Sequence, residues 1–160
     1  MENLSLILWR ERELLESLLY CLEQEQLVLT SGRTRWLARA AREVEGVLSE
    51  LRETELLRSV TADALAAELG LAPHPGLGEL AEVSGEPWRT ILLDHREALL
   101  VATRDIAERA ALNRELLSAG HAAAREALAA LEPVTGRVTD ASRHRGGTGG
   151  PRKLLLEQTT

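Results

Sequence analysis

The sequence predicts an all-α protein, an elongated antiparallel bundle of three long helices with one short helix in the connector and a flexible C-terminal tail. Aromatic residues make up only 2% of the 160 residues and Phe is absent, so the core must be built mainly from Leu, Val and Ala. Leucines also recur at alternating spacings of three and four residues, which is the period of an amphipathic helix. The length suits a single domain.

The first long helix is predicted from about Asn3 to Leu29. Only Glu11 and Glu25 interrupt its apolar seam. The seam consists of Leu4, Leu8, Leu15, Leu18, Leu22 and Leu29. Thr30, Ser31 and Gly32 then break the pattern, so the helix is expected to end there.

The second long helix is predicted from near Arg35 to Gly70, because glycine is a common stop signal for helices. Its seam begins with Leu37, Ala41, Val44, Leu48 and Leu51. The pattern slips at Thr54 and Glu55, which indicates a local change of winding. It is expected to recover through Leu57, Val60, Ala64 and Leu65.

Residues 71–78 (LAPHPGLG) contain two prolines and two glycines and are predicted to be a connector. A short helix is expected over residues 79–83. The third long helix is predicted to begin at Glu86 and Pro87 and to end at Pro133, with Asn113 in its seam. The other seam residues are Trp88, Leu92, Leu99, Ala102, Ile106, Ala110, Leu117, Ala124, Leu128 and Leu131.

The chain is therefore divided into a helical domain, residues 1–132, and a flexible, basic tail, residues 133–160. Apolar residues are sparse in most of the tail and glycines cluster there. The tail carries five basic residues and two acidic ones, while the whole chain has a net charge of −6. Charge is thus segregated between an acidic body and a basic tail.

Composition excludes several classes of function. The acidic charge and the lack of aromatics among basic residues argue against a nucleic-acid partner. No apolar run approaches the roughly 20 residues of a membrane span, so no integral membrane segment is expected. The first residues resemble no signal peptide and the single Cys21 cannot form an internal disulfide, so a cytoplasmic location is predicted, with Cys21 as a small core residue.

No motif for catalysis, a cofactor or a metal is present. The sequence lacks the P-loop, dinucleotide, HExxH and CxxC patterns, and GGTGGPRK in the tail has neither the spacing nor the preceding strand of a phosphate loop. His95 is interpreted as a packed polar residue with a partner. A phosphorelay role for His95 or His121 is the alternative, although such a site usually has a nearby lysine and Lys153 is the only one. The prediction is a protein that is not an enzyme and has no cofactor.

The order of several segments resembles the FlgN family of bacterial flagellar export chaperones. These are LESLLYCLEQEQLVLTSGRTRWL (15–37), ETELLRSVTADALAAELG (53–70), GLGELAEV (76–83) and ALNRELL (111–117). The resemblance covers roughly residues 4 to 131. Family members similarly place an Asn at the position of Asn113.

The resemblance implies a chaperone that holds the terminal helices of the hook–filament junction proteins FlgK and FlgL and presents them to the type III export gate. No nucleotide or metal is implied. Related proteins often have a tyrosine after the last long helix for docking at the gate, whereas the only tyrosine here is Tyr20, so no docking residue is carried over. A generic helical coiled-coil adaptor, another secretion chaperone and a homodimer remain open.

The substrate-protein surface is expected on the last long helix, at Leu116, Leu117, Ala124, Leu128 and Leu131. The run AGHAAAREALAAL (119–131) is rich in alanine and would leave a shallow groove that a partner helix can approach closely. Tight packing of this run within the bundle is the alternative. Asn113 is expected to fix helix register through a hydrogen-bonding mate, with solvent exposure as the alternative.

Three consecutive leucines, Leu154, Leu155 and Leu156, follow the glycine-rich part of the tail. We expect them to dock transiently on an apolar strip of this or a neighbouring chaperone until substrate displaces them. A tail without a role is the alternative.

Overall fold

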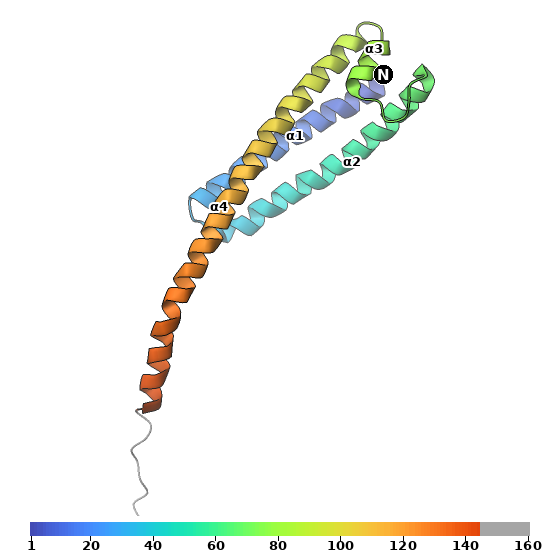
Figure 1. The fold of residues 1–160 in the computed structure, drawn as a ribbon. Coiled ribbons are helices and arrows are strands. Elements are labelled where there is room, and N and C mark those ends of the chain that lie inside the picture. Colours follow the sequence, from blue (N-terminus) through green and yellow to red (C-terminus); the bar gives the residue numbers. More distant parts are fainter. Residues whose placement is uncertain (145–160) are drawn as a thin grey trace, which may run out of the picture. The chain divides into compact units, whose positions relative to one another are not determined.

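The computed structural model describes the main chain of residues 1–144 and the side chains of residues 1–131. The described elements are all helical: α1 (Glu2–Thr30), the 3₁₀ helix η1 (Thr34–Trp36), α2 (Leu37–Leu69), α3 (Leu77–Val83) and α4 (Trp88–His144) (Figure 1). One compact unit spans Met1–Ser118 and a second begins at Ala119, with α4 continuing through both. The predicted all-α helical bundle is confirmed, and its packing is described here for the first unit.

The helix ends follow from residues that were expected to break the pattern. The Thr30 hydroxyl donates to the Gln26 carbonyl at 2.9 Å, and Gly32 adopts a φ of +66° in the turn that leads to η1. At the end of α2, Gly70 has a left-handed φ of +71°, and the Leu71 N–H donates to the Ala66 carbonyl at 2.9 Å. This conformation is favourable for glycine because it has no Cβ, so the predicted stop at Gly70 is confirmed.

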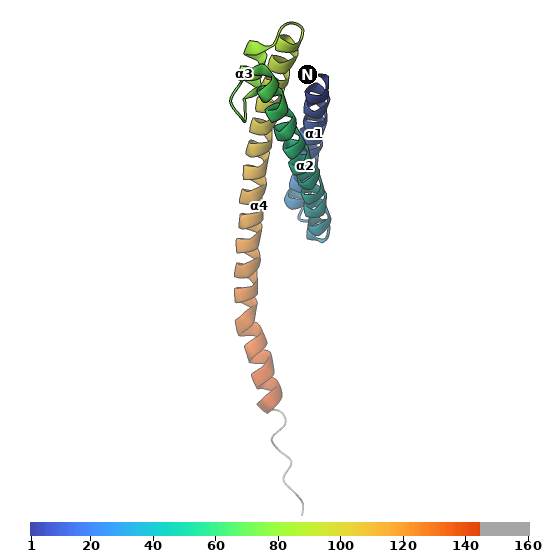
Figure 2. The ribbon, with the colours of Figure 1, turned by 90° about the vertical axis from the view of Figure 1, so that its right-hand side faces the viewer.

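Within the first unit α1 and α2 lie side by side and run antiparallel (Figure 2). Two apolar clusters hold the helices together. The first joins Leu4 and Leu8 of α1 to Ala62 of α2, and includes Leu80 of α3 and Leu92 of α4. This cluster lies at the end where α3 is found, close to the N-terminus (Figure 1).

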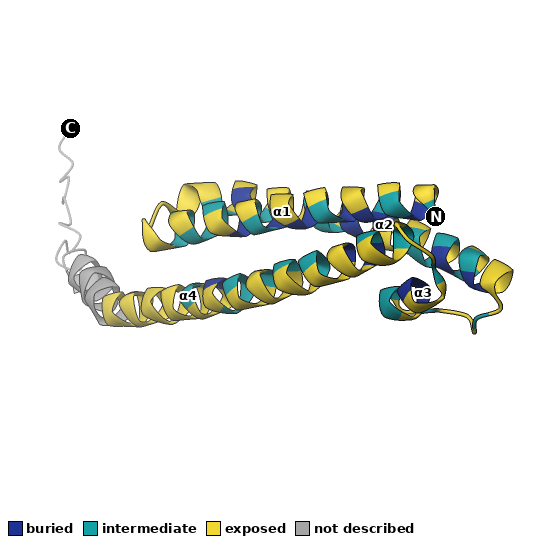
Figure 3. Cartoon of the chain, turned by 90° about the horizontal axis from the view of Figure 1, so that it is seen from above, coloured by how far each residue is buried: buried dark blue, intermediate teal, exposed yellow. Residues whose placement is uncertain are grey.

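The second cluster fills the middle of the same unit. Leu14, Leu15, Leu18 and Leu22 of α1 pack on Leu51 of α2. From α4 this cluster is covered by Leu99, Ala102, Ile106 and Ala110. Helix α1 therefore contacts α2 on one side and α4 on another, and its buried residues form a stripe along its length (Figure 3).

The predicted seam in the second half of α2 is wrong at three of its four positions, and only Leu65 packs against the first cluster. Leu57, Val60 and Ala64 are exposed, whereas Thr54, Ala62 and Ala66 are buried. The reason lies in α1, where the buried carboxylate of Glu11 takes a seam position and is paired by Arg58 of α2. Placing Arg58 on the inner face turns Leu57 and Val60 outward, because they lie one and two positions away, about 100° and 200° around the helix.

The predicted end of the last long helix at Pro133 is also wrong, because α4 continues to His144. A proline inside a helix removes one main-chain hydrogen bond and crowds the carbonyl four residues earlier. The bonds on either side persist, so a helix can bend at proline instead of ending. Residues 145–160, which include most of the predicted tail, lie outside the described residues.

Candidate helix-binding surface

Residues 119–131 of α4 present their side chains to solvent. Every residue of this run is exposed, including Ala124, and the exposed fractions of Leu128 and Leu131 are 66% and 58%. Figure 3 shows the exposed character of α4 in the stretch that precedes its grey part. Spacings of four and three residues place Ala124, Leu128 and Leu131 on one face of the helix. This part of α4 thus carries an exposed apolar face.

Leu116 and Leu117, the other two residues predicted for this surface, belong to the first unit. Leu116 is half-buried and Leu117 is exposed. Leu117 lines a groove of about 410 Å³ between the end of α1 and α4, together with Leu22, Leu29 and Ala110. The apolar lining continues that of the second cluster toward the end of α1.

Asn113 lies at one wall of this groove and bridges α4 to α1. Its side chain is 4% exposed, and its amide nitrogen donates to the main-chain carbonyl of Leu22 at 2.8 Å and to the carboxylate of Glu25 at 2.9 Å. The Asn113 amide oxygen is buried without a hydrogen-bond partner among the described residues. The geometry agrees with Asn113 as a seam residue with a mate on α1, and the alternative of a solvent-facing Asn113 is wrong.

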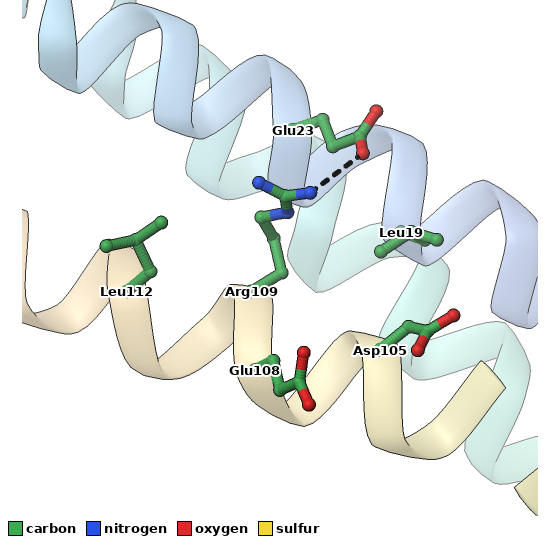
Figure 4. Close-up of a pocket in the computed structure, with 6 residues that line it drawn as sticks. All are labelled: Leu19, Glu23, Asp105, Glu108, Arg109 and Leu112. Carbon is green, nitrogen blue, oxygen red and sulfur yellow. Dashed lines mark hydrogen bonds and ion pairs between the residues drawn. The ribbon is translucent and has the colours of Figure 1, made fainter. Parts of the chain in front are cut away.

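A polar pocket adjoins this site on the same pair of helices (Figure 4). Arg109 of α4 reaches across to α1, where its guanidinium donates to the Gln26 amide oxygen at 2.6 Å and to the Glu23 carboxylate at 3.2 Å. Asp105 and Glu108 complete the acidic lining. These contacts hold α4 against α1 one turn before Asn113. Together with the hydrogen bonds of Asn113, they specify the register between the two helices.

The partners of the two glutamates that interrupt the seam of α1 were not predicted from the sequence. Glu25 accepts the hydrogen bond from Asn113. Glu11 forms a 2.8 Å ion pair with Nε of Arg58, although the N–H is not directed as in a hydrogen bond. Burial raises the pKa of the Glu11 carboxyl above 4.5, against the lowering effect of Arg58. The interruptions themselves were the signal that a polar mate must exist on a neighbouring helix.

His95 is a packed polar residue, as predicted. It is 1% exposed, its Nε2 lies 3.4 Å from the Ser5 hydroxyl, and the Trp9 ring meets it edge to face with a centroid distance of 5.0 Å. Burial lowers the pKa of His95, and the positive charge of Arg12 lowers it further. A buried imidazole that favours the neutral form does not suit the phosphorelay role for His95, because that role needs solvent access. His121, the other residue of that alternative, is exposed.

Two predictions remain, one for Cys21 and one for the leucines of the tail. Cys21 is only half-buried on α1, where burial raises the pKa of its thiol, so it is less enclosed than the predicted core position. Leu154, Leu155 and Leu156 lie outside the described residues.

Over the part of the chain that is described, no helix combines the length and apolar character that a bilayer span requires.

Comparison with known proteins gives one match. The family model described as FlgN protein matches residues 1–148, which is most of the chain. Neither the curated proteins nor the solved structures contain a match.

Proposed function

We propose that this chain, which belongs to the FlgN family, is a cytoplasmic type III flagellar export chaperone. In this proposal it binds the terminal helices of hook–filament junction proteins of the FlgK and FlgL type. Binding would prevent their premature assembly and allow delivery to the flagellar export gate. Neither a catalytic residue nor a cofactor is part of the proposal.

The observation that carries the proposal is the exposed apolar face of α4 at Ala124, Leu128 and Leu131. An amphipathic helix is recognised by laying its apolar face against a strip of this kind. The many alanines of residues 119–131 permit close approach of the two main chains, while the leucines supply apolar area for burial. Leu116 and Leu117 extend the same apolar pattern along α4 toward Asn113.

The proposed surface is tested by Leu128→Asp, with Ala122→Asp as the matched control. Both residues are exposed and both changes introduce one carboxylate. Helical spacing places residue 122 across the helix from Ala124 and Leu131 and about 120° from Leu128. Leu128→Asp should weaken binding of a FlgK-type protein at least about tenfold, because a buried leucine contributes about 1.5–3 kcal/mol. Ala122→Asp should change it by less than about twofold.

Binding is measured by calorimetry on the full chain, and circular dichroism checks that each variant keeps its helicity. Equal effects of the two variants would assign the binding surface to another part of the molecule. Loss of helicity in Leu128→Asp alone would instead show that Leu128 packs within the fold.

A further inference from the structure

A second groove lies between α2 and α4 within the Met1–Ser118 unit. Its volume is about 570 Å³. The α4 wall is formed by Arg96, Leu99, Leu100, Arg104 and Ala107, and the α2 wall by Glu55 and Arg58. Glu11 of α1 lies at the floor, and the first residues of α3 also line the groove.

The shape of the groove fits a helix. Residues 96, 100, 103 and 107 of its α4 wall follow spacings of four, three and four, so they form one stripe along α4 about 16 Å long. This length corresponds to three turns of a helix that would lie alongside. Because α1 already contacts both α2 and α4, the space between α2 and α4 is where a fourth helix would complete the packing.

The apolar part of the groove is only partly covered. Leu99 is half-buried against both clusters, but Leu100 is 58% exposed and Ala107 is exposed. A large exposed leucine is ordinary when it is isolated. Here it lies beside Leu99 and Ala107 in a hollow, which is the arrangement that a helix with leucines on one face would bury.

Charge specifies the chemistry of the occupant. Arg96 and Arg104 lie on either side of Leu99 and Leu100 along α4, and neither forms an ion pair with any residue that the structure describes. Eight residues separate them, or about 12 Å along the helix. At the floor, Glu11 and Arg58 neutralise each other. Glu55 contributes one negative charge on the opposite wall.

We propose that this groove binds one amphipathic helix of a partner protein whose apolar face packs on Leu99, Leu100 and Ala107. Two acidic side chains on the flank of that helix, spaced to match Arg96 and Arg104, pair with the two guanidinium groups. A basic side chain on its other flank faces Glu55. None of the residues that line this groove belongs to the predicted substrate surface at Leu116, Leu117, Ala124, Leu128 and Leu131.

The charges also distinguish this occupant from the C-terminal segment of the same chain. Leu154, Leu155 and Leu156 directly follow Arg152 and Lys153, and a single acidic residue, Glu157, comes after them. A segment with this balance is repelled by the arginines of the α4 wall. The groove is therefore assigned to an acidic helix from a partner.

The test uses two labelled synthetic peptides that form amphipathic helices with the same leucine face. One carries glutamates on its flank, spaced like Arg96 and Arg104, and the other carries lysines there. Fluorescence anisotropy with the full chain should give tighter binding of the glutamate peptide by about fivefold or more at low salt. The double substitution Arg96→Glu and Arg104→Glu should reverse this preference.

The control is Arg33→Glu with Arg42→Glu, which changes the net charge equally at exposed positions outside the groove lining. It should leave the preference intact, as should Leu128→Asp. Leu100→Asp should weaken both peptides at least about tenfold. Circular dichroism verifies that every variant remains folded.

Binding that ignores flank charge, or that responds equally to the control pair, overturns the proposal. Tighter peptide binding after deletion of residues 146–160 would identify the tail as the occupant. A dimer in light scattering that dissociates in the Arg96→Glu, Arg104→Glu chain would identify a second copy. Either result would contradict the proposal that the groove binds an acidic helix of a partner protein.

Discussion

The amide nitrogen of Asn113 on α4 donates a 2.8 Å hydrogen bond to the main-chain carbonyl of Leu22 on α1. A second hydrogen bond of 2.9 Å goes to the Glu25 carboxylate. Because the Leu22 carbonyl has a fixed position on its helix, this contact specifies one register of α4 against α1. A purely apolar seam would allow neighbouring registers with similar packing.

Two replacements of Asn113, one charged and one apolar, should differ in their effect on the free energy of unfolding. Asn113→Asp places a carboxylate against the Leu22 carbonyl and the Glu25 carboxylate, so it should lower the free energy of unfolding by at least about 2 kcal/mol at neutral pH. Asn113→Leu removes the buried amide, including its unpaired oxygen, and should change that free energy by less than about 1 kcal/mol. Urea unfolding followed by tryptophan fluorescence measures both, and equal losses in the two variants would contradict this account.

The raised pKa of Glu11 should make the free energy of unfolding depend on pH. Its pKa is raised above 4.5 in the folded protein, mainly by burial. Between the pKa of Glu11 in the unfolded chain and its higher pKa in the folded protein, the folded state binds more protons than the unfolded state. The contribution of Glu11 to the free energy of unfolding therefore falls as the pH rises through that window. Glu11→Gln should therefore gain stability relative to the natural chain as the pH rises above 4.5.

Urea titrations of both proteins across this pH range provide the measurement. Glu16→Gln is the control, because Glu16 is an exposed residue of the same helix. A natural chain that gains stability over Glu11→Gln with rising pH would show that the attraction of Arg58 outweighs burial.

His95 predicts the opposite trend at a higher pH. Burial and Arg12 hold its folded pKa below 6.5, so the unfolded state binds the extra proton first as the pH falls. The stability that depends on neutral His95 is complete above 6.5 and is lost as the pH falls toward the folded pKa. His95→Gln should remove this loss, while His121→Gln at an exposed position should retain it. Unfolding midpoints at several pH values decide between these outcomes.

The tail is predicted to compete with substrate. If Leu154, Leu155 and Leu156 dock on an apolar strip, their tether gives a local concentration of about a millimolar, which makes a weak contact effective. Deletion of residues 146–160 should then tighten binding of a FlgK-type protein, by a factor that depends on salt because basic residues of the tail are attracted to the acidic body. Affinity that is unchanged at low and moderate salt would leave the tail without this role.

The helical class and most helix boundaries were predictable because the spacing of leucines and the stop at Gly70 are local signals. The inner face in the second half of α2 was not predictable, because Arg58 turns inward only to meet Glu11, a residue 47 positions earlier in the chain. The hydrogen-bond partners of Asn113 also lie far away in the sequence. One of them is the main-chain carbonyl of Leu22, which any residue type would supply, so the sequence could not identify it. Pro133 misled because a local helix breaker was read as a helix end.

The exposed face of α4 was partly predictable. The alanine-rich run suggested a shallow groove; its residues are exposed, and a groove for substrate there stays a prediction. The groove between α2 and α4 could not be foreseen, because it is lined by residues from four helices that only the packing brings together.

The most direct test of the central claim is a calorimetric titration of the full chain with a FlgK-type junction protein, intact and without its terminal helices. A chaperone for these helices should show saturable one-to-one binding of the intact protein and no detectable binding of the truncated one. Equal binding of both forms, or binding of neither, would contradict the assignment of this chain as a chaperone for those helices.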